Sequence, residues 1–219
     1  MNNDGLNKFF AQIYTWMFVG LILSAVASFV TLNTNLGYII FSNKMLYYGL
    51  IGVQLILLFG VQLLINVFSV RASYFLFFLY AVLSGILLSG IFVMYTSASI
   101  MWIFLISALL FLGLAVIGFT TKKDLSSFGT VMWMGMIGVF VSSLINMFLQ
   151  NSLMDMIISG IAIIVFCGLT VYDNSAYKKI YNESRGKGMG KFVVLGALHM
   201  YINFIMIFVN LLNFFGDRS

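Results

Sequence analysis

Seven long apolar runs follow one another along the chain, and they constrain its fold more than any other feature of the sequence. The hydrocarbon core of a bilayer is about 30 Å thick, so a helix that crosses it needs about 20 predominantly apolar residues. Each run is close to that length. The predicted membrane spans are 9–32, 46–68, 74–95, 99–119, 128–149, 154–172 and 192–215.

The composition excludes an ordinary soluble domain. Only 8% of the 219 residues are charged and 62% are hydrophobic, whereas a soluble domain carries about 25% charged residues. Seven apolar helices in a row leave no polar exterior. We therefore predict an all-α membrane protein, a bundle of seven transmembrane helices forming a single domain over 1–219. Its Lys and Arg residues form no stripe with interleaved aromatic residues, so we expect membrane lipid and not nucleic acid as a partner.

The basic residues between the runs predict an orientation. With seven spans the loops alternate between two sides, and one side collects nine Lys and Arg residues while the other receives only Lys44 and Arg218. The positive-inside rule then places the amino terminus in the cytoplasm and the carboxyl terminus outside. Residues 178–191 are expected to form a flexible basic loop. Ala25–Ala27 resembles a signal-peptidase site, but the apolar run continues to Leu32, so we expect the first helix to be retained.

Polar side chains recur along the last apolar run at helical spacing. Because polar groups in hydrocarbon need partners, this stripe predicts that the last helix lies in the middle of the bundle. Helix packing through interhelical hydrogen bonds is the alternative explanation for each stripe. The candidate residues of a polar pathway are His199, Asn203, Asn210 and Asn213 on the last run, Gln62 and Asn66 on the second, and Asn146 on the fifth.

Asp173 differs from the other carboxylates because it ends the sixth apolar run, about one turn before Lys178 and Lys179. We expect it near the cytoplasmic mouth of the bundle. Carboxylate oxygens suit calcium, but one carboxylate alone makes a weak site. We therefore expect calcium only as a permeant or weakly bound ion, and no cofactor. The alternative is a residue at a helix end, paired with Arg71 or the nearby lysines.

Several motifs resemble those of the Bax inhibitor family, the transmembrane Bax inhibitor motif proteins. The resemblance covers nearly the whole chain and is most specific in the carboxyl-terminal third. Its motifs are Lys122–Ser126, Val171–Asp173, Ala197–Phe204 and Asn210–Gly216. The resemblance implies six helices wrapped around a central seventh, and a calcium leak governed by pH. It also makes a bacterial inner membrane the expected location.

The resemblance implies that two aspartates share a proton and latch the pore in bacterial relatives. Asp173 matches the first, but Asn203 stands at the second position. An Asp and Asn pair has no like-charge repulsion, so the amide can donate a hydrogen bond to the carboxylate and weaken the pH latch. His199 lies one turn before Asn203 on the same helix face. It is a hypothetical replacement for part of the lost proton sensor, and a neutral histidine bonded to a neighbouring helix is the alternative.

Two other classes of function compete with a cation leak. One is a non-conducting regulator that binds a membrane protease or other membrane proteins in stress response. The other is an intramembrane hydrolase, which we do not expect. An aspartyl protease would need a second aspartate where Asn203 stands, and Ser84 or Ser89 with His199 has no Gly-x-Ser-x-Gly context.

Overall fold

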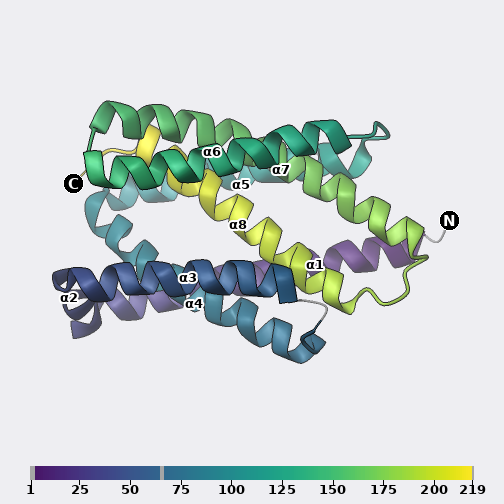
Figure 1. The fold of residues 1–219 in the computed structure, drawn as a ribbon, viewed down its shortest axis with the longest axis horizontal. Helices are drawn as coiled ribbons and strands as arrows, with labels where there is room; N and C mark the ends of the chain where they lie inside the picture. Colours follow the sequence, from purple (N-terminus) through teal and green to yellow (C-terminus); the bar gives the residue numbers. More distant parts are fainter. Residues whose placement is uncertain (1–2, 65–66, 219) are drawn as a thin grey trace. The chain divides into compact units, whose positions relative to one another are not determined.

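A computed structural model describes residues 3–64 and 67–218, and within these ranges the chain forms eight α-helices. All of them except α2 are long and apolar enough to cross a membrane, which gives seven candidate spans and confirms the predicted all-α, seven-helix fold. The helices are α1 (Asn3–Leu32), α2 (Asn35–Ser42), α3 (Lys44–Leu64), α4 (Val70–Met94), α5 (Ser97–Thr120), α6 (Ser126–Leu149), α7 (Ser152–Glu183) and α8 (Gly190–Phe215) (Figure 1).

The short helix α2 was not predicted. It lies between the first two spans, where the side chains of Thr34 and Asn43 accept hydrogen bonds from backbone amides at the start of the next helix. The hydroxyl of Thr34 accepts a hydrogen bond of 3.4 Å from the amide of Leu36 and caps α2. The side-chain oxygen of Asn43 accepts hydrogen bonds from the amides of Met45 and Leu46, 3.1 and 3.2 Å long, and so caps α3. Such caps satisfy amides that have no partner within their own helix.

The helix α7 is longer than predicted. The expected end at Tyr172 is wrong, because α7 continues to Glu183. The expected flexible loop over 178–191 is therefore also wrong for its first part, and only residues 184–189 connect α7 to α8. Asp173, Asn174 and Tyr177 are buried while Lys179 is exposed. This segment is thus an amphipathic extension, which a search for apolar runs does not detect.

The chain divides into two compact units. Unit 1 contains residues up to Met94 together with Gly186–Tyr201, and unit 2 contains Tyr95–Arg185 together with Ile202–Arg218. Helices α1 to α4 belong to unit 1 and helices α5 to α7 to unit 2. Helix α8 belongs to unit 1 up to Tyr201 and to unit 2 from Ile202 onward.

In unit 1, α1 and α4 approach closely through small residues. A Cβ atom added at Gly85 would lie 2.6 Å from the Cα atom of Ser24 and closer still to its carbonyl oxygen. The buried Ser24 hydroxyl donates to the Ala81 carbonyl at 2.7 Å and lies 2.6 Å from the Tyr201 hydroxyl. Next to it, Gln54 of α3 donates to the hydroxyl of Ser84 at 2.8 Å. The small-residue face of the first helix therefore serves close helix packing.

In unit 2, α7 packs against both α5 and α6. Glycines mark both contacts. A Cβ atom at Gly118 of α5 would meet the backbone of Val171 and the side chain of Asn174, and one at Gly168 of α7 would meet the side chain of Met132. These close approaches hold the middle of α7 between its neighbours.

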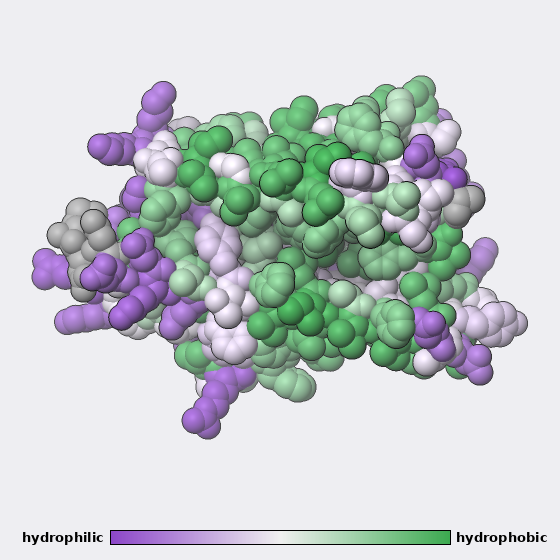
Figure 2. Space-filling model, turned by 180° about the vertical axis from the view of Figure 1, so that it is seen from behind, coloured by the Kyte–Doolittle hydropathy of each residue, from purple (hydrophilic) through white to green (hydrophobic). Residues whose placement is uncertain are grey.

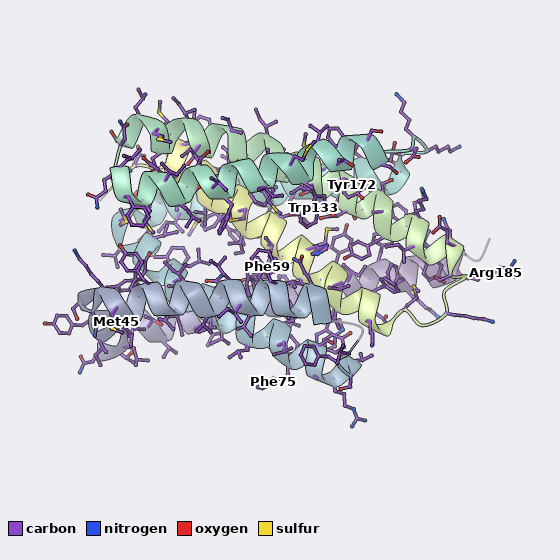
Figure 3. All side chains as sticks on the ribbon, in the orientation of Figure 1. Met45, Phe59, Phe75, Trp133, Tyr172 and Arg185 are labelled. Carbon is purple, nitrogen blue, oxygen red and sulfur yellow. The ribbon has the colours of Figure 1, made fainter. Side chains whose placement is uncertain are left out.

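Exposed and buried residues follow the pattern of a membrane protein. Apolar side chains cover most of the face that Figure 2 shows. Large apolar side chains such as Met45 and Phe75, both labelled in Figure 3, are 86% and 67% exposed, as expected for groups that face lipid. In contrast, 61% of the apolar window of α8 is buried, against 6% to 44% for the other candidate spans. This burial agrees with the prediction that the last helix is surrounded by other parts of the chain.

Candidate functional site

Asp173 lies inside helix α7 and not at its end. The helix continues for almost three turns beyond it, to Glu183. The carboxylate is nearly inaccessible, with an exposed fraction of 5%. The expectation of a helix-end residue is therefore corrected, and the cause is the amphipathic extension of α7.

The side-chain amide of Asn203 donates a hydrogen bond of 2.8 Å from Nδ2 to Oδ2 of Asp173. Both residues belong to unit 2, and Asn203 is only 3% exposed. An ionised carboxylate can only accept hydrogen bonds, so the amide nitrogen of Asn203 must be the group that faces it. The hydrogen bond expected between this aspartate and this asparagine is present.

The residues next to Asp173 and Asn203 in the sequence pack closely against α6 and α5. Tyr172, the residue before Asp173, covers Gly129 of α6, where a Cβ atom would meet the tyrosine ring. On α8, the ring of Phe204 next to Asn203 makes edge-to-face contacts with Phe104 and Phe111 of α5, at centroid distances of 5.5 and 5.7 Å. The carboxylate and the amide are both buried, and a hydrogen bond removed from water is stronger than one in water.

Lys178 lies near this pair in sequence, but its hydrogen bonds go to the end of α5. Its ammonium group donates to the carbonyl of Phe119 at 2.7 Å and lies 5.5 Å from the centre of the same ring. A cation at the carboxyl end of a helix satisfies carbonyl groups that the helix leaves open. Lys178 thus joins α7 to α5 by binding a carbonyl.

Three of the candidate residues lie in the described part of unit 1. His199 is half-buried on α8, with its Nε2 atom in the interior. Gln62 is half-buried in the last turn of α3. Arg71 is exposed in the first turn of α4, and its suggested pairing with Asp173 stays a prediction. Asn66 lies outside the described residues.

The candidate residues of unit 2 divide into two kinds. Asn146 and Asn210 make local contacts, because Asn146 accepts from the amide of Asn151 at 3.2 Å and Asn210 donates to the carbonyl of Met206 on its own helix at 2.7 Å. Asn213 instead reaches across to α7, where it donates to Asp155 and Ser159 at 2.9 and 2.8 Å.

The sequence analysis singled out neither Asp155 nor Ser159 and so missed this second contact. One signal was available, since Asp155 and Ser159 are one helical turn apart and face the same side of α7. The residues described by the structure contain no group of three or more His, Cys, Asp or Glu side chains able to hold a metal ion.

Comparison with known proteins gives one family. Residues 6–219 match the family described as Inhibitor of apoptosis-promoting Bax1. Inner membrane protein YbhL of Escherichia coli K12 is 37% identical over 218 residues, which cover 98% of this chain and 93% of the relative. An uncharacterized protein of Borreliella burgdorferi and an uncharacterized membrane protein of Streptococcus pyogenes serotype M3 are also 37% identical, each over at least 97% of this chain and 93% of the relative. With seven candidate spans and a match over nearly its whole length, this multi-pass membrane protein belongs to the Bax inhibitor family.

Proposed function

We propose that this protein is a passive cation pathway, with calcium as the expected permeant ion, and that Asp173 is the carboxylate that the cation meets. The observation that carries the proposal is a buried carboxylate on a membrane helix, held by the amide of Asn203. Ionisable residues within transmembrane segments are costly to insert, so they usually mark ion or proton pathways.

The partner of Asp173 determines how strongly pH acts on the pathway. A carboxamide donates to the ionised carboxylate and adds no second negative charge, so the pair needs no shared proton to stay together. We therefore propose a leak with a shallow pH dependence near neutrality. His199 is the candidate for what pH dependence remains.

The same proposal includes the setting in the membrane. A relative is named an inner membrane protein, and we propose that this chain lies in a bacterial inner membrane. The excess of basic residues on one set of loops supports a cytoplasmic amino terminus and an outward carboxyl terminus.

Calcium uptake by liposomes that contain the purified protein and an entrapped calcium indicator tests the proposal. We expect uptake above that of protein-free liposomes, and a decrease of about tenfold in Asp173→Asn, since the loss of one charge–charge attraction near a protein surface is worth at least that much. Asp124→Asn is the matched control, because it removes an exposed carboxylate outside the spans. Wild-type uptake equal to that of empty liposomes would overturn the proposal.

A further inference from the structure

The short helix α2 is joined to a membrane span at each of its ends. Two residues separate it from α1, and one residue separates it from α3. An extended residue reaches at most about 3.6 Å, so α2 must stay at the membrane face where α1 ends and α3 begins. With 8 residues, α2 is only about 12 Å long and cannot cross a hydrocarbon core of about 30 Å.

One side of α2 packs against the other helices of unit 1 (Figure 1). Ile40 on this side is buried. A Cβ atom at Gly37 would lie 2.9 Å from the carbonyl oxygen of Thr31, so the start of α2 lies directly on the end of α1. The ring of Phe41 would lie 2.9 Å from a Cβ atom at Gly90 of α4. These contacts determine which side of α2 faces the protein, and therefore which sides stay exposed.

The exposed sides of α2 differ in polarity. With about 3.6 residues per turn, the exposed residues Asn35 and Ser42 share one line along the helix, opposite the side that packs against the protein. Leu36 and Ile39 lie between these two sides and form an apolar flank, with exposed fractions of 46% and 53%. Such a distribution suits a helix that lies flat in a membrane surface, with its polar line toward water.

Tyrosine side chains gather around the same end of unit 1. Tyr38 of α2 is 79% exposed. Tyr47 and Tyr48 lie near the start of α3 with their ring centres 5.6 Å apart, and Tyr47 also contacts the ring of Phe41 at 5.8 Å. Tyrosine is enriched where a bilayer meets water, because its ring is apolar and its hydroxyl is polar. The aromatic residues thus indicate the same interfacial layer as the apolar flank does.

We infer that α2 is an interfacial anchor, which lies along the membrane surface with its apolar flank in contact with lipid. Leu36 and Ile39 contact acyl chains just below the headgroups, while Asn35 and Ser42 face water. The partner is lipid, because the spans on both sides of α2 already expose apolar side chains to lipid and α2 continues that surface. The anchor keeps the connection between α1 and α3 at a fixed depth. A helix in water and a docking surface for another protein are the competing explanations, and both leave Leu36 and Ile39 in water in the purified protein.

Fluorescence quenching in liposomes tests the inference on the full-length protein. Single cysteines are introduced as Leu36→Cys or Ile39→Cys in a Cys167→Ser background and labelled with bimane. Asn35→Cys and Ser42→Cys are the matched controls on the same helix. One quencher is a lipid with a nitroxide on its acyl chain near the headgroup, and the other is iodide in the water. We expect the nitroxide lipid to quench the two labels of the apolar flank at least about twofold more strongly than the two control labels, and iodide to give the reverse order.

A fifth label provides the reference for full immersion. Ile56 is 71% exposed and lies in the middle of α3, so a label at Ile56→Cys should be reached by the nitroxide lipid and not by iodide. Strong iodide quenching at all four α2 positions, without quenching by the nitroxide lipid, would overturn the inference and would leave α2 as a helix in water.

A polar substitution in the apolar flank gives a second test. Ile39→Gln, combined with the label at Leu36→Cys, should weaken quenching by the nitroxide lipid and strengthen quenching by iodide, each by about twofold, because a polar side chain disfavours insertion among acyl chains. An unchanged pattern would contradict the inference, since contacts with the protein alone would then hold α2 in place. None of these measurements depends on ion conduction.

Discussion

The amide of Asn203 donates to the carboxylate of Asp173 over 2.8 Å, and both side chains are buried. A carboxamide thus occupies the position where relatives are expected to carry a second carboxylate. The difference is one of charge and not of shape, because Asn and Asp have nearly the same size. It allows the effect of a second charge to be tested by a single substitution.

Asn203→Asp should give the proposed leak a steeper pH dependence than that of the wild type. Two carboxylates at this distance share a proton at low pH and repel each other once both are ionised, so the pair should separate as pH rises. We expect calcium uptake of the variant to increase by about tenfold between about pH 5.5 and 8, as one titrating proton allows.

Asn210→Asp is the matched control for that experiment. It introduces the same charge on the same helix, at a residue whose amide donates to the carbonyl of Met206 on that helix. A similar pH profile in both variants would contradict a specific pairing with Asp173 and would indicate a general effect of negative charge on α8.

His199→Ala should flatten the remaining pH dependence of wild-type uptake. The imidazole is the only histidine side chain of the chain and is half-buried on α8, one turn before Asn203. Histidine is the side-chain type that proteins most often use as a pH sensor. Uptake across about pH 5.5 to 8 in liposomes checks the prediction, and identical profiles for the variant and the wild type would dismiss a sensor at this position.

Hydropathy predicted the seven spans well because the bilayer imposes a minimum apolar length on each of them. It did not predict the part of α7 beyond Tyr172, where burial of Asn174 and Tyr177 supports a helix with few apolar residues. The capped helix α2 depends on local hydrogen bonds of Thr34 and Asn43, which hydropathy does not register.

The candidate site was predictable only in part. The Asp173 and Asn203 contact followed from family motifs, whereas the Asp155 and Asn213 contact depends on how two distant segments approach each other. Helical spacing on one chain segment indicates a face but does not identify the partner of that face. Asn210 illustrates the limit, since it shares the polar stripe yet bonds to its own helix.

Ser126→Ala should raise the pKa of Asp124 toward its ordinary value of 3.8. In the folded chain this pKa is lowered, first by the hydrogen bond from the Ser126 hydroxyl, then by the Ser126 amide and the charge of Lys179. A lowered pKa means that folding favours the ionised form. Its stabilising contribution is therefore complete above pH 3.8 and is lost as pH falls through the lower, folded-state pKa.

Carbon NMR of aspartate-labelled protein in detergent micelles measures this titration. Ser127→Ala is the control, because the neighbouring hydroxyl is exposed and one residue further into α6. An unchanged Asp124 midpoint in Ser126→Ala would show that the Lys179 charge and the backbone amide alone account for the shift.

Gly85→Ala should destabilise the packing of α1 against α4. The added methyl group would lie 2.6 Å from the Cα atom of Ser24, and backbone atoms cannot rotate away as a side chain can. Overpacking of this kind costs about 1 to 3 kcal/mol.

Gly52→Ala on α3 is the control, since nothing lies within 4 Å of a Cβ atom there. Alanine stabilises a helix interior by about 0.5 to 1 kcal/mol relative to glycine. Unfolding in mixed detergent micelles should therefore show opposite signs for the two variants. Equal effects would mean that α1 can move away from α4 without cost, and that the hydrogen bond from Ser24 to the Ala81 carbonyl does not fix their distance.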